Sequence, residues 1–507
     1  MSSGRVILTG AGPGDPGLLT LRAAEALRKA DVLLYDALAS DAIVSMAPPH
    51  CEKVFVGKRG GNHAMHQDDI EALMVRKARD GKTVVRLKGG DPFVFARGGE
   101  EAQTLVRESI PFEVVPGVTS AIAAPAYAGI PVTHRDFNVA FTVATGHEDP
   151  VKAHSTLDWT KLADPHQTLV LLMAMANLRE IAAQLRANGL PADRPVAVIR
   201  EGTRPQQITA VGTLETIADE VERAGIGAPA IVIIGDVVRL RDELRWFDRA
   251  PLFGKRVLVT RPAHQQEEFA AALRAFGAEP ISLPMIEITE AQDPTEALDI
   301  LNDLKLFGWI VFTSANGVDV FFRNLHESRK DARAIGTSRV AAIGPATADR
   351  LRAYGIVADL IPPHYIAEEI AAALLPLTQQ GERILIYRAE VAREELVESL
   401  RNAQREPRVV AAYATRSSRA ENFLERVQAC DVITFTSAST VNGFVQNAGD
   451  ETAARNAARG KIIACIGPVT AAAAHAAGLE VAVVADEFTS CGLIEALLRH
   501  CETAPVS

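Results

Sequence analysis

The chain has 507 residues, which is too many for one ordinary hydrophobic core, so two or more domains are expected. Hydrophobic residues make up 48%, and the net charge of -10 contains no block of like charges, which excludes a generic nucleic-acid binder. No apolar run approaches the roughly 20 residues that span a bilayer, and no signal-peptide core follows Met1. We therefore expect a cytoplasmic globular protein that binds neither membrane nor nucleic acid.

Cysteine and histidine usage gives no sign of a metal site. The five cysteines include no Cys-x-x-Cys pair, which favours free thiols in a reducing compartment. His63 and His66 precede Asp68 and Asp69, but this stretch is typical of a polar loop and helix start. We predict no bound metal.

In chain order, the first half alternates short β-rich runs with helical ones. The expected strands are 6–9, 32–35 and 84–87, and the expected helices are 18–29, 70–79 and 101–108. A second group of strands is expected near 141–145, 168–173, 196–200, 207–211 and 230–234, with helices at 178–187 and 214–223. This alternation predicts an α/β fold with a largely parallel first sheet, and the second group suggests a second sheet in this half.

The pattern breaks at the stretch 248–255, before a new strand at 256–260. A polar and proline-containing interruption of this kind is typical of a domain boundary. We predict a first domain at 1–248, a linker at 249–255 and a second domain at 256–507.

The second domain contains an internal repeat. Phe312-Thr313-Ser314-Ala315-Asn316 recurs as Phe435-Thr436-Ser437-Ala438-Ser439, and Ile343-Gly344-Pro345-Ala346-Thr347-Ala348 recurs as Ile466-Gly467-Pro468-Val469-Thr470-Ala471. Both pairs share one offset, which predicts two similar lobes facing each other, each with two strand–turn–helix units. A cleft between the lobes is the expected ligand site.

The most informative stretch is 85–101, where the apolar run 84–87 is followed by Gly89-Gly90-Asp91-Pro92, and Arg97-Gly98-Gly99 precedes an acidic helical run. A glycine loop after a strand lies where open α/β sheets bind ligands. Gly10-Ala11-Gly12-Pro13-Gly14 followed by Asp36 also offers a dinucleotide-binding alternative. Against it, Pro13 and Pro16 lack N–H donors and position 15 is Asp rather than Gly, so a rigid loop beside an organic ligand fits better.

Residues 5–248 resemble the tetrapyrrole methylases and look close to uroporphyrinogen-III C-methyltransferase. The motifs that carry the resemblance are residues 10–17 and 34–36, Val56-Gly57-Lys58-Arg59, the Gly89-Gly90-Asp91 block, Val115-Pro116-Gly117-Val118-Thr119-Ser120, residues 129–135 and Thr145-Gly146-His147-Glu148. The resemblance implies a fold of two subdomains, S-adenosylmethionine as methyl donor with S-adenosylhomocysteine as product, and a homodimer through this half.

The resemblance also implies site residues. Cofactor contacts are expected at Pro13, Gly89, Gly90, Asp91, Val94, Thr119, Ser120, Met173, Gly202, Pro229 and Ala230. Asp36 is the expected base, which removes the proton that ring alkylation leaves, and Lys58 the expected proton donor. The implied substrate carries eight carboxylates, so its expected partners are Arg59, Arg86, Lys88, Arg97, His134 and Arg135, about half of them in actual contact.

Residues from about 254 to 500 resemble uroporphyrinogen-III synthase, on the repeat together with Val257-Leu258-Val259-Thr260-Arg261-Pro262 and Tyr413 after a β run. The resemblance implies a bilobal α/β fold without cofactor, with lobe one at about 256–285 plus 412–500 and lobe two at about 286–411. Tyr413 is the candidate for assisting loss of the substrate hydroxyl. The residues expected to line the cleft are Thr313, Ser314, Thr347, Thr436, Ser437 and Thr470.

Together these features predict an enzyme that is α/β throughout and bifunctional in tetrapyrrole biosynthesis. Its C-terminal half would make uroporphyrinogen III from hydroxymethylbilane, and its N-terminal half would methylate that product twice to precorrin-2. The alternatives are a methylase of another corrin intermediate fused to a non-catalytic synthase-like module, and a NAD-binding oxidoreductase. Because the methylase motifs begin at residue 5, we expect no dehydrogenase or chelatase activity of the kind found in sirohaem synthases.

Overall fold

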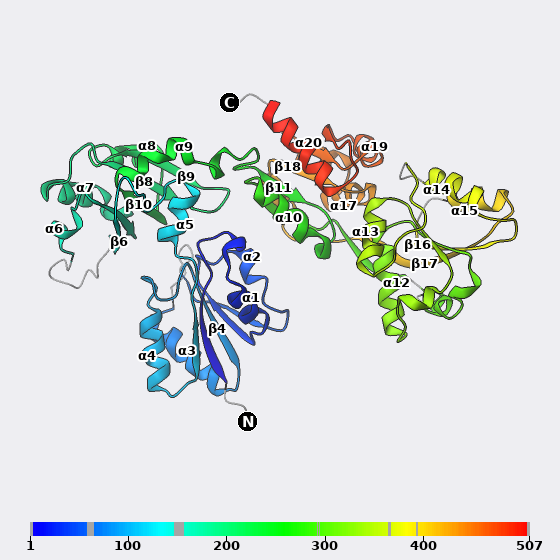
Figure 1. Cartoon of the computed structure of the whole chain (residues 1–507), viewed down its shortest axis with the longest axis horizontal. Coiled ribbons are helices and arrows are strands. Elements are labelled where there is room, and N and C mark those ends of the chain that lie inside the picture. Colours follow the sequence, from blue (N-terminus) through cyan, green and yellow to red (C-terminus); the bar gives the residue numbers. More distant parts are fainter. Residues whose placement is uncertain are drawn as a thin grey trace. The chain divides into compact units, whose positions relative to one another are not determined.

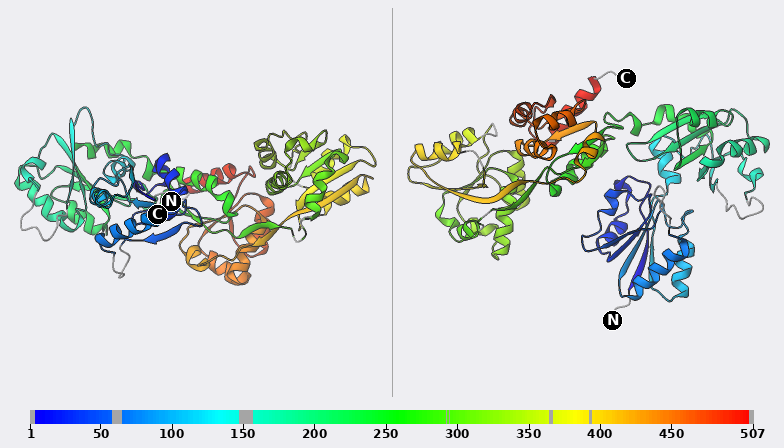
Figure 2. Two further views of the ribbon diagram at one scale, coloured as in Figure 1. Left: turned by 90° about the horizontal axis from the view of Figure 1, so that it is seen from below. Right: turned by 180° about the vertical axis from the view of Figure 1, so that it is seen from behind.

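The structure is a computed structural model that describes residues 4–57, 65–146, 157–291, 293, 295–363, 367–391 and 394–503. Contacts within the chain divide it into two units. The first comprises Met1–Gly254 with Phe276–Glu279, and the second comprises Lys255–Ala275 with Pro280–Ser507. Each unit contains two five-stranded sheets covered by helices, which can be followed by colour in Figures 1 and 2. Among the described residues, no helix combines the length and apolarity required to cross a membrane.

The first sheet has the strand order β3-β2-β4-β1-β5, and all of its pairs are parallel. Its strands are β1 (Arg5–Gly10), β2 (Val32–Tyr35), β3 (Glu52–Phe55), β4 (Thr83–Lys88) and β5 (Phe112–Val115). Its helices are α1 (Leu21–Arg28), α2 (Asp41–Val44), α3 (Gln67–Arg79) and α4 (Gly98–Arg107). Apolar residues of α1 and α2 pack on one face of the sheet, and those of α3 and α4 pack on the other.

Helix α1 begins later than the expected helix 18–29. Pro16–Leu18 forms a separate 3-10 turn, capped by the side chain of Asp15, and Thr20 then caps α1 by accepting a hydrogen bond from the Ala23 amide. The expected helix is divided because Asp15 and Thr20 each cap a separate helical segment.

The second sheet has the order β6-β7-β10-β8-β9 and mixes one parallel pair with three antiparallel pairs. Its strands are β6 (Ala140–Thr145), β7 (Gln167–Leu172), β8 (Pro195–Arg200), β9 (Ile208–Thr213) and β10 (Ala230–Ile234). Its helices are α5 (Ser120–Tyr127), α6 (Trp159–Leu162), α7 (Leu178–Ala187), α8 (Ile217–Arg223) and α9 (Arg241–Leu244). Helix α5 leaves the first sheet and packs its alanines against one face of the second, so it links the two.

In the second unit, the third sheet has the order β12-β11-β18-β19-β20. Its strands are β11 (Arg256–Val259), β12 (Glu279–Ser282), β18 (Val432–Phe435), β19 (Ile462–Cys465) and β20 (Val481–Val484), and its helices are α10 (Gln266–Ala275), α16 (Phe423–Gln428), α17 (Ala438–Ala448), α18 (Glu451–Ala458), α19 (Pro468–Ala476) and α20 (Ser490–Thr503). Strands β11, β18, β19 and β20 run parallel, so their carboxyl ends lie along one edge.

The fourth sheet has the order β13-β17-β16-β14-β15. Its strands are β13 (Ile286–Glu290), β14 (Trp309–Phe312), β15 (Arg339–Ala342), β16 (Arg383–Ala389) and β17 (Glu406–Ser417), and its helices are α11 (Thr295–Asp299), α12 (Ala315–Glu327), α13 (Pro345–Ala353), α14 (Ala367–Leu374) and α15 (Glu395–Asn402). Strand β17 stays paired with β13 as far as Ser417, past the lobe boundary expected at 411. The fold class predicted from the sequence is confirmed in both units.

Candidate functional site

Two glycine loops meet at the carboxyl ends of neighbouring strands in the first sheet. The amide of Gly12, after β1, donates to the carbonyl of Gly90, after β4, at 3.1 Å, and the Gly90 amide donates back to Gly12 at 2.8 Å. The helices that follow these strands leave to opposite faces, α1 to one and α4 to the other. Loops that diverge in this way from adjacent parallel strands form the usual ligand crevice of an open α/β sheet.

A third loop closes on the same place. A Cβ atom on Gly117, after β5, would lie 2.2 Å from the Gly90 carbonyl oxygen, and one on Gly10 would lie 2.4 Å from it. Asp91 fixes the arrangement, because its Oδ2 accepts from the Gly117 amide at 3.1 Å and its Oδ1 from the Phe93 amide at 2.8 Å. These contacts fix the backbone around Gly90 and Asp91, two of the predicted cofactor residues.

The second sheet gathers its own predicted cofactor residues at one edge. Strands β7 and β8 both run antiparallel to β10, so the end of β7, the end of β8 and the start of β10 coincide. Met173, Gly202 and the Pro229–Ala230 pair stand at these three positions. Met173 is half exposed and has a positive φ of 54°, a conformation rare for a non-glycine residue and worth noting at a site.

Contacts between residues far apart in sequence join the two edges. The hydroxyl of Tyr127, in α5, donates to Asp15 Oδ2 at 2.8 Å, and the Asp15 amide donates to Thr203 Oγ1 at 3.1 Å. Burial and the Asp15 carboxylate raise the pKa of Tyr127, so this hydroxyl stays protonated and keeps donating. Gly202 lies against Ala124, where a Cβ would meet the alanine methyl at 2.5 Å. Helix α5 thus connects Thr119 and Ser120, at its own start, with the edge of the second sheet.

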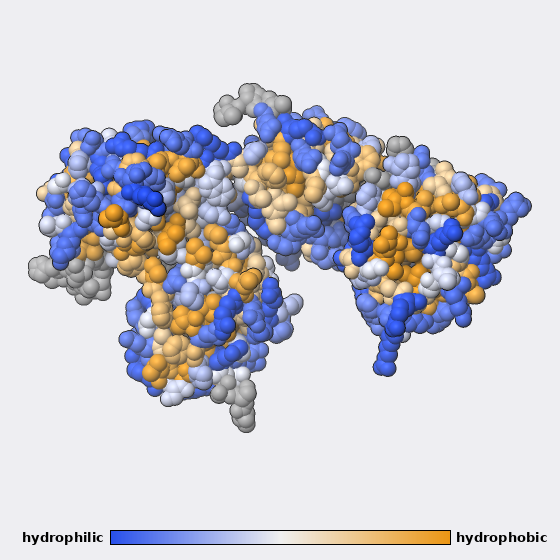
Figure 3. Space-filling model, in the orientation of Figure 1, coloured by the Kyte–Doolittle hydropathy of each residue, from blue (hydrophilic) through white to orange (hydrophobic). Residues whose placement is uncertain are grey.

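Apolar side chains are exposed beside these loops. Leu38 packs over Gly89, and Phe93 and Phe95 follow Asp91 in the loop between β4 and α4; all three are between 45% and 55% exposed. Figure 3 shows hydrophobic residues among hydrophilic ones on the face of the first unit that it draws. An exposed apolar surface next to a polar crevice is typical of a binding site for a large, partly apolar ligand.

Asp36 stands at the end of β2, next to Lys88 at the end of β4. The register pairs Tyr35 with Leu87, so Asp36 and Lys88 are the next neighbours on these parallel strands. Asp36 Oδ1 accepts from the Leu38 amide at 3.0 Å, which leaves Oδ2 of the carboxylate for other partners. The structure therefore brings the expected base to the same edge as the glycine loops.

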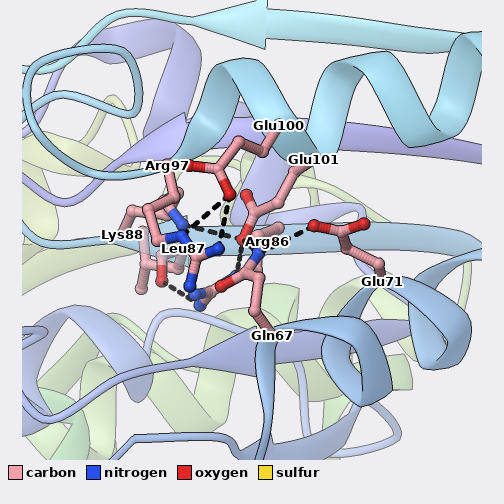
Figure 4. A network of polar contacts seen from close by, with 8 residues as sticks. All are labelled: Gln67, Glu71, Arg86, Leu87, Lys88, Arg97, Glu100 and Glu101. Carbon is pink, nitrogen blue, oxygen red and sulfur yellow. Dashed lines mark hydrogen bonds and ion pairs between the residues drawn. The ribbon is translucent and has the colours of Figure 1, made fainter. Parts of the chain in front are cut away.

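Lys88 belongs to a buried ion cluster, drawn in Figure 4. Glu101, Lys88 and Arg86 are 0%, 3% and 4% exposed, and Glu101 Oε1 lies 2.8 Å from Lys88 Nζ and 3.1 Å from Arg86 Nε. Gln67 Nε2 donates to the same oxygen at 3.2 Å, whereas Oε2 has no hydrogen-bond partner. Burial, and after it the neighbouring Arg86 charge, lower the pKa of Lys88 below its ordinary value, and the opposing effects of Glu101 and Asp36 offset this only in part.

The residues predicted to bind substrate carboxylates differ in burial and in their ion-pair partners. Arg86 and Lys88 pair inside the protein with Glu101, whereas Arg97 is exposed and pairs with Glu100 on the first turn of α4. His134 and Arg135 lie on the surface loop before β6, where His134 Nδ1 accepts from the Asp136 amide at 3.2 Å. Lys58 and Arg59 lie outside the described residues.

Two further predicted cofactor residues lie in the same loops. Pro13 is half-buried in the loop after β1, and Val94 is half-buried in the loop after β4.

In the second unit, the repeat places equivalent residues at equivalent helix starts. Ser314 caps α12 and accepts from the Gly317 amide at 3.0 Å, and Ser437 caps α17 and accepts from the Thr440 amide at 3.3 Å. Thr313 and Thr436 precede these caps and are half-buried, whereas Thr347 and Thr470, in α13 and α19, are buried. A hollow of about 490 Å³ opens beside the starts of α17 and α19, lined by Ala438, Pro468, Val469, Ala472 and Ala473.

Tyr413, in β17, lies beside the first of these caps. Its hydroxyl is 2.7 Å from Ser314 Oγ, and its side chain is 4% exposed. Burial raises the pKa of Tyr413, so the group remains a neutral hydrogen-bond donor. The tyrosine and serine that were predicted separately form one hydrogen-bonded pair.

Three of the residues that fix these sites, Glu101, Tyr127 and Thr203, were absent from the sequence-based predictions. A usable signal existed for Glu101, because two cations in an otherwise apolar strand require a buried carboxylate nearby. No comparable signal existed for Tyr127 or Thr203, whose partner Asp15 is distant in sequence. No group of three His, Cys, Asp or Glu side chains suited to a metal ion occurs in the described part of the chain.

Two family models match the chain: "Tetrapyrrole (Corrin/Porphyrin) Methylases" over residues 5–218 and "Uroporphyrinogen-III synthase HemD" over residues 267–495. The uroporphyrinogen-III C-methyltransferase of Bacillus subtilis is 43% identical over 363 residues, covering 72% of this chain and 74% of that protein. The S-adenosyl-L-methionine-dependent uroporphyrinogen III methyltransferase of Methanosarcina barkeri is 54% identical over 241 residues, covering 48% of this chain and 94% of that protein.

A third relative matches along almost the whole chain. The porphyrin biosynthesis protein HemD of Ruminiclostridium josui is 38% identical over 507 residues and is covered to 98%, as is this chain. The chain therefore belongs to the HemD family of porphyrin biosynthesis proteins, with a tetrapyrrole methylase segment followed by a uroporphyrinogen-III synthase segment.

Proposed function

We propose that the second unit closes hydroxymethylbilane to uroporphyrinogen III and that the first unit methylates this product twice, with S-adenosylmethionine, to precorrin-2. The observation that carries the proposal is the mutual bridge between Gly12 and Gly90, locked by Asp91, in a unit that resembles a named S-adenosylmethionine-dependent methyltransferase. The product of one unit would then be the substrate of the other.

The geometry of the first unit fits the methyl donor. The residues that would hold it are Pro13, Gly89, Gly90, Asp91, Val94, Thr119, Ser120, Met173, Gly202, Pro229 and Ala230. The close approach of Gly10 and Gly117 leaves backbone rather than side chains facing this crevice. When bound, S-adenosylmethionine supplies an electrophilic methyl group. The protein's own task is to hold an electron-rich pyrrole carbon in line with that methyl, which is a problem of positioning.

Asp36 would then take the proton that alkylation leaves on the ring. It stands at the sheet edge that carries the glycine loops, next to Lys88 on the neighbouring strand. Lys58 would donate a proton. Arg59, Arg97, His134 and Arg135 remain proposed partners of the substrate carboxylates, and the buried Arg86 and Lys88 support the site through Glu101.

In the second unit, ring closure requires loss of the bilane hydroxyl as water. The Tyr413 hydroxyl, held by Ser314 in a water-poor position, is suited to donating a hydrogen bond to that leaving oxygen. The other residues proposed to line the cleft lie in the turns and helix starts of the repeat: Thr313, Thr347, Thr436, Ser437 and Thr470. We propose no cofactor for this reaction, since folding the bilane and assisting departure are both tasks for side chains and backbone.

We also propose a homodimer through the first unit. Strand β9 forms an edge of the second sheet, and its Ile208 and Val211 are exposed to 44% and 47%. An apolar sheet edge is usually covered in the native assembly. Sedimentation equilibrium of the full chain checks this, and a monomer at micromolar concentration would contradict it.

One experiment separates the two activities. The purified full chain is given hydroxymethylbilane with and without S-adenosylmethionine, and the tetrapyrroles are identified by absorbance and mass after oxidation. We expect type III uroporphyrin without the methyl donor and a dimethylated product with it. Type I uroporphyrin alone, which spontaneous closure gives, would refute the synthase assignment; added uroporphyrinogen III that stays unmethylated would refute the methyltransferase assignment.

A further inference from the structure

Arg261 stands at the carboxyl edge of the third sheet, two residues after the last pair of β11 with β18, Val259 with Thr434. The backbone there is firmly held, because Thr260 Oγ1 donates to the Thr434 carbonyl and Thr434 Oγ1 donates to the Leu258 carbonyl, both at 2.7 Å. The same edge carries the starts of α17, α19 and α20, which follow β18, β19 and β20. In an open parallel sheet this edge is where ligands bind.

The side chain of Arg261 is half-buried, and it lacks an anionic partner among the described residues. Its Nη1 donates to Ser490 Oγ at 2.7 Å, and its Cζ lies 5.7 Å from the centre of the Phe269 ring. Its Nε is buried without a hydrogen-bond partner. No carboxylate in the described part of the chain forms an ion pair with it, and Glu268 acts on it only from a longer distance. Burial accordingly lowers the pKa of Arg261.

Other withdrawn arginines in this unit are satisfied. Arg405 donates through Nε to Thr378 Oγ1 at 3.1 Å and through Nη2 to the Leu375 carbonyl at 3.0 Å. Arg388 forms an ion pair with Glu394. An unpaired buried charge costs free energy that a folded protein ordinarily avoids. Arg261 is half-buried and its Nε has no hydrogen-bond partner, so it retains part of that cost in the free protein, which indicates a partner that arrives from outside the chain.

We infer that Arg261, together with Ser490, is an anchor for one carboxylate of the tetrapyrrole that the second unit binds. The inference rests on the proposed function, which supplies a polycarboxylate substrate. A guanidinium presents its N–H donors as a planar fork that matches a carboxylate. The start of α20 at Ser490 adds a favourable partial positive charge for the same anion. The apolar hollow beside Ala438 and Pro468, at the same sheet edge, suits the pyrrole framework that carries the carboxylates.

The test uses the full chain and measures the initial rate of type III ring formation from hydroxymethylbilane. S-adenosylmethionine is left out, so that the first unit cannot methylate the product. Arg261→Met removes the charge at similar length. We expect KM for hydroxymethylbilane to rise about 10- to 100-fold, the worth of a charge-assisted hydrogen-bonded pair, while kcat changes less than about 3-fold. Arg261→Lys keeps the charge without the fork, so its KM should be intermediate. Arg274→Gln is the matched control, because Arg274 lies on α10 and pairs with exposed Glu267.

A stability measurement separates binding from a structural role. Because Arg261 is unpaired in the free protein, we expect the urea midpoint of Arg261→Met to equal or exceed that of the wild type. A lowered midpoint with unchanged KM would mark Arg261 as structural and overturn the inference. An unchanged KM for both Arg261 variants in a protein that makes type III product would also overturn it, while leaving the proposed function intact. A wild type that yields only the type I ring would instead refute the proposed function and this inference with it.

Discussion

The hydroxyl of Tyr413 lies 2.7 Å from Ser314 Oγ, so the end of the repeat's first Thr-Ser turn and strand β17 meet at one hydrogen bond. Ser314 Oγ also accepts from the Gly317 amide at 3.0 Å, and a serine that donates its own proton to the tyrosine oxygen leaves the Tyr413 proton available to a substrate oxygen. A neutral donor in a water-poor position is worth far more than the same donor in water.

Tyr413→Phe should therefore lower kcat for type III ring formation by about 10- to 100-fold, with little change in stability, because Ser314 keeps its backbone partner. The measurement is steady-state cyclisation with separation of the type I and type III products. Tyr354→Phe serves as control, since Tyr354 stacks on Phe322 at 4.2 Å in the same lobe and its hydroxyl donates to Asp319. Wild-type kcat in Tyr413→Phe would contradict the assigned role.

The adjacent glutamates of α4 provide a matched pair for the ion cluster. Glu101→Ala leaves two cations in the interior without a carboxylate, so we expect the free energy of unfolding of the first unit to fall by about 3–5 kcal/mol. Glu100→Ala breaks only an exposed pair with Arg97 and should cost less than about 1 kcal/mol. Urea unfolding of both variants checks this, and equal losses would show that the buried cluster contributes no special stability.

Asp36 is testable as the base of the methyl-transfer site. Asp36→Asn keeps an acceptor for the Leu38 amide, so the loop should remain in place while proton removal slows. We expect the methylation rate of uroporphyrinogen III to fall about 10²- to 10⁴-fold, with S-adenosylhomocysteine affinity unchanged by calorimetry. Asp41→Asn, on the exposed first turn of α2, is the control. Methylation at the wild-type rate in Asp36→Asn would exclude this role.

The glycine crevice gives a steric prediction. A Cβ on Gly117 would lie 2.2 Å from the Gly90 carbonyl oxygen, and backbone cannot yield as a flexible side chain can. Gly117→Ala should weaken S-adenosylhomocysteine binding at least about 10-fold and cost about 1–3 kcal/mol of stability through overpacking. Gly99→Ala is the control, because nothing lies within 4 Å of that position. Equal affinities in the two variants would remove the crevice from the binding site.

The sequence was sufficient for features that depend on local pattern. The apolar run 84–87 lies within β4, and the 123-residue repeat places Ser314 and Ser437 at equivalent helix starts, because strand, turn and cap signals all lie within a few residues of each other. The class of fold and the two family segments followed from such local signals.

Features that depend on tertiary packing were not accessible in this way. Arg86 and Lys88 were expected to face substrate carboxylates, and only the packing of α4 on the sheet shows that Glu101 pairs with both. The Asp15–Thr203 hydrogen bond spans 188 residues and depends on how α5 joins the two sheets. The role proposed for Arg261 depends on its surroundings in the fold, because the sequence does not distinguish an arginine with an ion-pair partner from one without.

Ionisation of the buried Tyr387 hydroxyl should lower the free energy of unfolding at alkaline pH. Its side chain is fully buried in the fourth-sheet lobe, its hydroxyl accepts from Asn324 Nδ2 at 3.0 Å, and burial raises its pKa from 10.0 to about 12. The folded pKa exceeds the unfolded one, so the contribution to stability is complete below pH 10 and is lost as the pH rises towards 12. The loss amounts to about 1.4 kcal/mol per pH unit for one proton, or about 2–3 kcal/mol in all.

Tyr387→Phe isolates this contribution. At pH 7 the variant should be about 1–3 kcal/mol less stable, because Asn324 loses its acceptor in the interior. Between pH 10 and 12 the difference between wild type and variant should shrink, since only the wild type loses the contribution of this phenol. Urea unfolding of both proteins at closely spaced pH values between 8 and 12 measures it. Parallel stability curves over that range would mean that the Tyr387 hydroxyl ionises as readily in the folded protein as in the unfolded chain.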